Sequence, residues 1–254
     1  MRIASFNILN GRSPEDDRVD AARLADAVKI LDADVLALQE VDRNQPRSEY
    51  ADLTAIAADA MGAVEHRFVA ALSGSPGATW IAATGAEQPD QAAYGIALLS
   101  RHPVSSWEVI RLPAMPVRVP MRFQGRLRPV LVRDEPRVAV AADVEAPDGP
   151  LTVVATHLSF VRYWNGRQLR SLARALGTHR RPLFLVGDLN MGRRRAAGVT
   201  GLQPLASALT FPADQPREQL DHVLADGPVG KVSSYALRLP LSDHRALVVD
   251  LARG

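Results

Sequence analysis

The sequence predicts an α/β fold in a single domain that spans residues 1–254. Short apolar segments bounded by turn-forming residues alternate along the chain with amphipathic segments of helical period. A strand–helix–strand order occurs twice, which indicates two similar layers whose strand ends converge. With 254 residues, of which 47% are hydrophobic, the chain is long enough to bury one large core.

The first strand–helix–strand unit lies at the N-terminus. Residues 2–7 alternate and end on Asn7, which predicts a strand. We expect a helix after Pro14, with Ser13 as its N-cap and with one apolar face formed by Leu24, Val28 and Leu31. Residues 34–39 are predicted to form the second strand, which ends in a polar cluster that contains Gln39, Glu40 and Asp42.

The middle of the chain predicts a helix and a series of strands. The helix covers residues 49–61, with Leu53, Ile56, Ala57 and Ala60 inward and Gly62 as its stop. Strands are expected at residues 67–71, 80–83 and 94–100, the last closed by Pro103. Residues 111–136, rich in proline and arginine, predict a long excursion with strand fragments, and residues 138–144 and 151–157 predict a hairpin.

The second strand–helix–strand unit starts with the strand that ends at His157. A helix opened by Asn165 follows, with Gly177 after it and with Leu169, Leu172, Ala173 and Leu176 on one face. The next strand is the apolar run PLFLVGDLN at residues 182–190, where an extended chain would put Asp188 and Asn190 on the same face. Three further strands are expected at residues 220–224, 232–237 and 246–251.

The composition excludes several classes of site. The chain has no cysteine, which excludes disulfides, thiolate metal sites and cysteine nucleophiles. It has no apolar run long enough to span a membrane, and its first residues lack the apolar region of a secretory signal. We therefore expect a soluble cytoplasmic protein. No segment of the sequence indicates a protein partner.

Polar residues gather where the predicted strands end. Their carboxylate and amide oxygens are hard ligands that suit Mg²⁺, with Mn²⁺ as the alternative, whereas no pair of histidines has the spacing of a zinc site. The two histidines are then free for proton transfer, and Asp221 is the natural candidate to orient His244. The residues are Asn7, Glu40, His157, Asp188, Asn190, Asp221, Asp243 and His244.

Seven short motifs in this order resemble those of the endonuclease/exonuclease/phosphatase superfamily. They cover nearly the whole chain and are SFNI at residues 5–8, LQEVD at 38–42, YGIALLSR at 94–101, THL at 156–158, GDLN at 187–190, QLDHVL at 219–224 and SDHRAL at 242–247. The resemblance implies a four-layered α/β sandwich, in which two packed mixed β-sheets are flanked by helices. It differs from the family's apurinic endonucleases at Leu9, where they carry an acidic residue.

The resemblance also implies roles for the residues that match its motifs. Glu40 would be the main metal ligand, helped by Asn7 and Asp243. Asp188 and Asn190 would position the attacking water and the scissile phosphate. His244, oriented by Asp221, would act as a base or as a phosphate-stabilising cation, and His157 would contact phosphate or serve as the acid. Tyr94 matches a position near the phosphate, although an aromatic side chain there could equally serve packing.

The function that follows is metal-dependent hydrolysis of a phosphodiester by in-line attack of water, as in a nuclease or a small phosphodiester hydrolase. The alternative within the same class is a phosphomonoesterase or a hydrolase of lipid head groups such as phosphoinositides or sphingomyelin. A non-catalytic binding module that has kept the fold is a third hypothesis. The expected partner is a phosphate-ester substrate, with nucleic acid as one candidate.

Arginines supply candidate contacts to an anionic substrate. Only Lys29 and Lys231 are lysines, so nearly every basic side chain carries a guanidinium fork, which suits phosphate, although codon bias would also explain the count. One cluster, Arg193, Arg194 and Arg195, lies in the presumed loop after Asn190. Arg137 would point into the cleft from its strand. Another cluster lies in the proline-rich excursion: Arg118, Arg122, Arg126 and Arg128.

Overall fold

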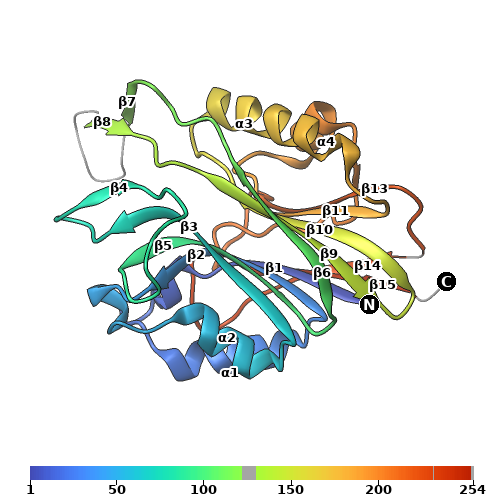
Figure 1. The fold of residues 1–254 in the computed structure, drawn as a ribbon, viewed down its shortest axis with the longest axis horizontal. Helices are drawn as coiled ribbons and strands as arrows, with labels where there is room; N and C mark the ends of the chain where they lie inside the picture. Colours follow the sequence, from blue (N-terminus) through green and yellow to red (C-terminus); the bar gives the residue numbers. More distant parts are fainter. Residues whose placement is uncertain (122–129, 231, 253–254) are drawn as a thin grey trace.

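Two β-sheets packed face to face form the centre of the molecule, and helices cover the outer face of each sheet (Figure 1). The computed structural model describes residues 1–121, 130–230 and 232–252. Helices α1 (Ala21–Leu31) and α2 (Leu53–Met61) lie below the sheets in Figure 1, and α3 (Arg162–Ala175) and α4 (Arg193–Thr200) lie above them. The predicted four-layered α/β sandwich is thereby confirmed.

Both sheets are mixed. The strands of the seven-stranded sheet are, in spatial order, β14 (Val232–Leu237), β15 (Ala246–Leu251), β1 (Arg2–Asn7), β2 (Val35–Arg43), β5 (Ala93–Ser100), β3 (Glu65–Gly74) and β4 (Trp80–Ala82). Those of the six-stranded sheet are β12 (Gln203–Pro204), β13 (Asp221–Asp226), β11 (Leu183–Asp188), β10 (Gly149–His157), β9 (Val138–Ala146) and β6 (Val104–Arg111). A separate hairpin joins β7 (Arg118–Met121) to β8 (Val130–Arg133), and short 3₁₀ helices occur at Leu9–Gly11, Pro46–Ser48 and Leu176–Thr178.

The two predicted strand–helix–strand units form the parallel pair at the centre of each sheet. Strands β1 and β2 are parallel and joined through α1, and β10 and β11 are parallel and joined through α3. Each pair has antiparallel neighbours on both sides. Since parallel strands end at the same edge of a sheet, the polar residues that close these strands are brought together in each sheet.

Three hydrophobic layers hold the sandwich together. The central one lies between the sheets and contains Ile3 and Val186, whereas Phe6 packs toward α1 and α2, and Leu185 packs toward α3. Successive residues of these strands thus point to opposite hydrophobic layers, so the strands are apolar on both faces. This explains why PLFLV is a continuous apolar run and not an alternating one.

Three helix starts differ from the prediction. Ser13 is not the cap of α1, because the helix begins after Asp20, whose carboxylate accepts hydrogen bonds from the backbone N–H groups of Ala22 and Arg23. Asp52 caps α2 in the same way, so that this helix starts later than residue 49. Helix α3 begins before Asn165, at Arg162. In the first two cases an aspartate close to the apolar face competes successfully as the cap.

Other elements are longer than predicted or were missed. Strand β2 continues to Arg43 through a bulge, so Glu40 lies within it and not after it. Strand β6 was missed because it is an edge strand whose pattern is mostly exposed, and α4 occupies the predicted loop after Asn190. The excursion does contain strand fragments, β7 and β8. Arg122, Arg126 and Arg128 lie outside the described residues.

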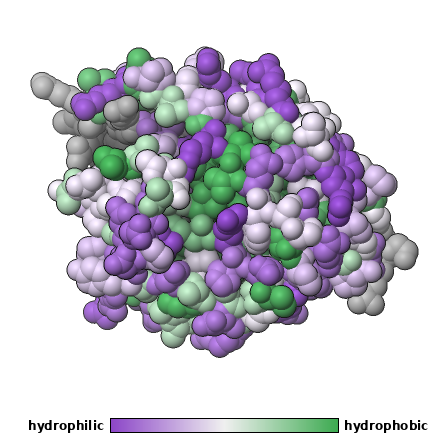
Figure 2. All heavy atoms as spheres, in the orientation of Figure 1, coloured by the Kyte–Doolittle hydropathy of each residue, from purple (hydrophilic) through white to green (hydrophobic). Residues whose placement is uncertain are grey.

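Among the helices of the described ranges, none is long and apolar enough to cross a membrane. Figure 2 shows hydrophilic side chains over most of the face seen in Figure 1, with a smaller hydrophobic patch near the centre. The first strand, β1, pairs with the last strand, β15, with Arg2 opposite Asp250.

Candidate active site

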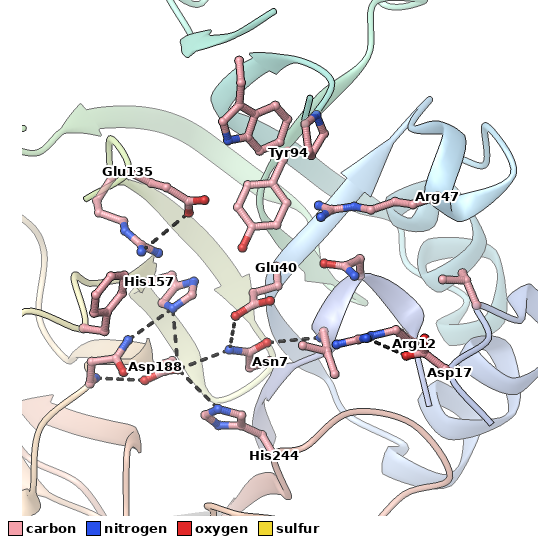
Figure 3. A pocket seen from close by; sticks show the side chains of 18 residues that line it. Asn7, Arg12, Asp17, Glu40, Arg47, Tyr94, Glu135, His157, Asp188 and His244 are labelled. Carbon is pink, nitrogen blue, oxygen red and sulfur yellow. Dashed lines mark hydrogen bonds and ion pairs between the residues drawn. The ribbon is translucent and has the colours of Figure 1, made fainter. Parts of the chain in front are cut away.

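A cavity of about 770 Å³ lies where the strand ends of the two sheets meet. Most of the predicted site residues line it, and Figure 3 shows their side chains pointing toward one another. The predicted residues that line it are Asn7, Glu40, Tyr94, Arg137, His157, Asp188, Asn190 and His244. Asp221 lies buried directly behind His244. The structure therefore brings the widely separated motifs into one site.

Glu40 reaches the cavity because of a bulge in β2. The pairing of β2 with β5 shifts between Gln39 and Val41, and Glu40 has a backbone φ of +57°. A bulge re-aims one side chain, and such strained backbone is common at functional sites. The neighbours Gln39 and Val41 are fully buried, whereas Glu40 faces the cavity.

Asn7 links the two sheets at the floor of the cavity. Its amide nitrogen donates one hydrogen bond to Glu40 Oε1 at 3.1 Å and another to Asp188 Oδ2 at 3.2 Å (Figure 3). Its amide oxygen accepts from the backbone N–H of Leu9 at 3.2 Å. One amide group thus bridges a carboxylate of each sheet and fixes their relative position.

Three neighbouring strands of the six-stranded sheet place a histidine and two aspartates side by side. His157 of β10 pairs in register with Asp188 of β11, and Asp188 pairs with Asp221 of β13. Strand β11 ends at Asp188, so Asn190 is not part of the extended chain: it lies in the left-handed region with φ +51°. Its backbone N–H donates to Asp188 Oδ1 at 2.9 Å, and its side chain still reaches the cavity.

His244 forms a tight pair with Asp221. The ring Nδ1 lies 2.9 Å from Asp221 Oδ2, and the ring Nε2 faces Asp188 Oδ2 at 3.8 Å. Burial alone would lower the pKa of His244, but the charge and hydrogen bond of Asp221, with the charge of Asp188, raise it to about 10. His244 is therefore an imidazolium at neutral pH, and Phe211 packs against its ring at 4.8 Å between centroids.

His157 has the opposite protonation state. Burial, followed by the nearby charges of Arg137 and His244, lowers its pKa well below the ordinary value of 6.5. Its Nε2 lies 3.3 Å from the amide nitrogen of Asn190, which can only donate, so Nε2 is the acceptor. The site therefore holds one cationic and one neutral imidazole on opposite sides of Asp188.

Both carboxylates on the cavity floor are harder to ionise than free ones. Burial raises the pKa of Glu40, and the nearby Asp243 adds to this. Burial also raises the pKa of Asp188, helped by the charge of Asp221. Of the described residues, Asn7 is the side chain that donates to Glu40. A desolvated carboxylate with so little compensation fits a site that a cation completes.

Two groups of side chains could hold a metal ion. Ligand atoms of Asp188, Asp221 and His244 lie within 4.8 Å of one another. In this group the Nδ1 of His244 already pairs with Asp221 Oδ2 at 2.9 Å. The second group is Glu40, whose carboxylate offers hard oxygen donors at the open face of the cavity. The neighbouring Asn7 turns its amide nitrogen to Glu40 and its oxygen to the Leu9 N–H, so its oxygen would meet an ion only after the amide rotates. Asp243 does not line this cavity, although it is close enough to influence Glu40.

Tyr94 and two neighbours form one wall of the cavity. The Tyr94 hydroxyl points toward Glu40 in Figure 3, and burial, followed by the charge of Glu40, raises the pKa of Tyr94 well above 10.0. Its ring lies 5.7 Å from that of Trp80, and the Arg47 guanidinium lies 5.4 Å from the Tyr94 ring. Arg47 is fixed by two hydrogen bonds to the fully buried Asp42, at 2.8 and 2.7 Å.

Of the arginines predicted to contact substrate, Arg137 lines the cavity, whereas Arg193 and Arg194 do not. Arg137 is 5% exposed and lines the cavity, with Asp134 and Glu135 at 3.5 and 3.6 Å and its Nε without a partner among the described residues. Arg193 and Arg194 do not line the cavity, contrary to expectation, because a helix starts after Gly192 and carries them to the surface. Arg195 also lies in this helix and donates to the backbone oxygen of Arg162.

Several cavity residues were not singled out from the sequence. They are Arg12, Asp17, Arg47, Trp80, Glu135 and Phe160. Arg12 and Asp17 pair across a turn at 2.6 Å, and no periodic pattern marks such a turn. A signal did exist for Arg47, because Asp42 is a carboxylate in a largely buried strand, and a buried carboxylate needs a cationic partner nearby.

Comparison with known proteins agrees with the family resemblance of the sequence motifs. Residues 4–244 match the Endonuclease/Exonuclease/phosphatase family. No match was found among curated proteins. An endonuclease/exonuclease/phosphatase from Beutenbergia cavernae has a similar structure, with a TM-score of 0.71 and 24% identity over 100% of this chain and 72% of that one.

Two other similar structures carry more specific descriptions. A mannosyl-6-phosphatase from Bacteroides thetaiotaomicron has a TM-score of 0.67 and 14% identity, over 99% of each chain. A mutant beta toxin from Staphylococcus aureus with bound magnesium ions has a TM-score of 0.66 and 12% identity, over 98% of each chain. At these identities the structures establish the fold alone. Together with the family match over nearly the whole sequence, they lead to one conclusion: this chain belongs to the endonuclease/exonuclease/phosphatase family.

Proposed function

We propose that the protein is a magnesium-dependent phosphoesterase that hydrolyses a phosphodiester by direct attack of water. The observation that carries the proposal is the arrangement at the cavity floor. There the Asn7 amide bridges Glu40 and Asp188, with a neutral His157 on one side of Asp188 and a cationic His244 on the other. Carboxylates, a proton acceptor and a cation in one cavity are the parts that phosphoryl transfer to water requires.

Glu40 and Asn7 would hold the metal ion, with Asp243 next to them. Their oxygen donors suit Mg²⁺, and Mn²⁺ would be accepted by the same donors. When bound, such an ion neutralises charge on the phosphate and assists the leaving oxygen. The raised pKa of Glu40 supports this assignment, because a cation there would offset the cost of burying the carboxylate.

The residues of the six-stranded sheet would handle water and phosphate. In the reaction a water oxygen bonds to phosphorus, the ester P–O bond breaks, one water proton passes to a base, and the leaving alkoxide gains a proton. Asp188 and the neutral His157, whose Oδ2 and Nε2 lie 3.6 Å apart, would be the acceptors for the water proton, and the amide of Asn190 would hold the water or a phosphate oxygen. His244 and Arg137 would offset the charge that develops on the phosphate oxygens.

A phosphomonoesterase is the second candidate, since the relative from Bacteroides thetaiotaomicron is named as a phosphatase. Three arginines, Arg12, Arg47 and Arg137, line the cavity and would also suit a monoester dianion. A lipid head-group hydrolase belongs to the same alternative. The reaction class stays the same in each case, and the substrate decides among them.

The test is a substrate screen with Mg²⁺ or Mn²⁺, with Glu40→Ala as the blank. Plasmid DNA, single-stranded DNA, RNA, bis-p-nitrophenyl phosphate, p-nitrophenyl phosphate, inositol phosphates and sphingomyelin are compared. Metal-dependent turnover of a diester that Glu40→Ala lacks is the expected result. Turnover of monoesters alone would favour the phosphatase. Folded protein with no turnover of any substrate and no metal binding would favour a binding module instead.

A further inference from the structure

A second cavity of about 570 Å³ lies outside the active site, between β3 and β6. Arg43 of β2, Arg67 of β3 and Arg111 of β6 converge on it, and we call it the arginine groove after these three residues. Within residues 1–121, 130–230 and 232–252, none of the three forms an ion pair with a carboxylate. Arg43 is half-buried, whereas Arg67 and Arg111 are exposed, so the groove presents three guanidinium groups to solvent without a carboxylate partner among the described residues.

Aromatic rings hold two of these guanidinium groups in place. Arg43 lies over Phe68 at 4.7 Å, and Arg67 lies over Trp107 at 5.7 Å. Arg43 Nη2 donates a long hydrogen bond of 3.4 Å to the backbone oxygen of Gln88, and its buried Nε has no partner among the described residues. Stacking on a ring face fixes a guanidinium while leaving its in-plane N–H groups free to donate.

The acidic residue of the groove does not neutralise it. Glu87 turns its carboxylate to its own loop, where it accepts from the backbone N–H of Gly85 at 2.9 Å and from Thr84 Oγ1 at 3.1 Å. Arg111 lies close to the same loop, since a side chain at Gly85 would meet Arg111 Nη2 at 3.0 Å. Three guanidinium groups and one carboxylate leave a net positive site with free donors.

The groove is connected to the active site by two strands. Arg43 follows Glu40 by three residues on β2, which corresponds to roughly 10 Å of extended chain. On the other sheet, the residue after Arg111 donates from its backbone N–H, that of Leu112, to the backbone oxygen of Arg137 at 3.0 Å. The groove thus lies next to the active site along both sheets.

We propose that the arginine groove binds a phosphate group of the substrate other than the one that is cleaved. Guanidinium forks match phosphate oxygens in pairs, and three converging forks match a phosphate better than a carboxylate or a halide. The assignment of this phosphate to the substrate rests on the proposed function. The phosphate would be carried either along a nucleic-acid strand or on a multiply phosphorylated small molecule.

The test measures binding without turnover, in EDTA, by isothermal titration calorimetry. The probes are a 5′-phosphorylated single-stranded decanucleotide and inorganic pyrophosphate. The double variant Arg67→Gln/Arg111→Gln is compared with the unaltered protein, with Arg67→Lys/Arg111→Lys, and with Arg174→Gln, which removes an exposed arginine of α3. Circular dichroism checks that each variant is folded.

For the double glutamine variant we expect the affinity to fall on the order of tenfold or more, because two phosphate contacts are lost. The slope of log affinity against log salt for the decanucleotide should become shallower by about 0.7 for each arginine removed. The affinity of the lysine variant should lie between those of the glutamine variant and the unaltered protein. Arg174→Gln should have the affinity of the unaltered protein.

The two probes separate the source of the phosphate. If the double glutamine variant loses affinity for the decanucleotide alone, the groove binds a nucleic-acid strand. If it also loses affinity for pyrophosphate, the groove binds phosphate from any source. Unchanged affinity for both probes in the double glutamine variant overturns the proposal, as does an equal loss in Arg174→Gln. Because binding is measured without metal, a protein that hydrolyses nothing still gives a clear answer about the groove.

Discussion

The two strand–helix–strand units at the centre of the molecule share an architecture but differ in the chemistry at their strand ends. The unit β1–α1–β2 contributes Asn7 and Glu40, an amide and a carboxylate that bond to each other. The unit β10–α3–β11 contributes His157 and Asp188, and the neighbouring β13 adds Asp221 behind the His244 ring. Asn7 is the point of contact between the two sets, since it also donates to Asp188.

The two units differ in the protein groups that surround their buried carboxylates, Asp188 and Glu40. Asp188 is surrounded by protein donors, namely Asn7, the backbone of Asn190 and the His244 cation. Glu40 has the Asn7 amide and a face open to the cavity. In the proposed function, the first unit would receive a cation from outside, whereas the second, whose Asp188 still has a raised pKa, would handle protons and phosphate.

The largest expected effect comes from the first unit. Changing Glu40 to Gln keeps the side-chain shape and removes the charge, so kcat should fall on the order of 1,000-fold as metal assistance is lost. The measurement is steady-state hydrolysis of bis-p-nitrophenyl phosphate with Mg²⁺, together with a thermal melt. A variant that melts normally and retains most of its activity would contradict the role of Glu40.

A somewhat smaller loss is expected in the second unit. Asp188→Asn should lower kcat on the order of 100-fold, since one proton acceptor is removed while His157 remains. Its effect on stability has the opposite sign. A carboxylate whose pKa is raised in the folded state opposes folding once it ionises, so the variant should melt higher than the unaltered protein at pH 8 in EDTA. A lower melting temperature would show that Asp188 stabilises the fold.

The His244–Asp221 pair gives a prediction for pH. The folded-state pKa of His244 is raised to about 10 from 6.5, so its stabilising effect is complete below pH 6.5 and is lost as the pH rises to about 10. His244→Gln should therefore cost about 2 kcal/mol of unfolding free energy at pH 6, the scale of a charged hydrogen bond, and much less at pH 10. Urea unfolding at both pH values measures this, and an equal cost at both would refute the ionised pair.

The smallest effect on hydrolysis is expected from substitutions in α4, away from the strand ends of both units. Arg193→Gln/Arg194→Gln alters two exposed residues of α4 that do not line the cavity, so hydrolysis of bis-p-nitrophenyl phosphate should change by less than about twofold. A large rise in KM would mean that α4 contacts substrate after all, and the second unit would then extend beyond its strand ends.

The sequence was most informative where strands end. Apolar runs that stop at Asn7, His157 and Asp188 each place a polar residue at a strand end, and taken together they predicted both the sheets and a shared site. It was least informative where tertiary contacts decide. Glu40 reaches the cavity through a bulge, which depends on pairing with β5 and leaves no periodic signal.

Local competition also limited the prediction. Ser13 and Asp20 are both acceptable helix caps, and the choice depends on where the apolar face of α1 meets the sheet. The arginines after Asn190 read equally well as a loop or a helix, because arginine is a good helix former that also suits a surface loop. Edge strand β6 buries little apolar surface, so it gave no clear alternation.

Direct binding of Mn²⁺, followed by electron paramagnetic resonance, tests the division of labour between the two units most directly. Glu40→Gln and His244→Gln are compared with the unaltered protein. We predict that Glu40→Gln abolishes tight binding and that His244→Gln retains it, because Glu40 is the proposed metal ligand, whereas His244 is a cation paired with Asp221. The reverse result would place the metal at Asp188, Asp221 and His244 and would contradict the account.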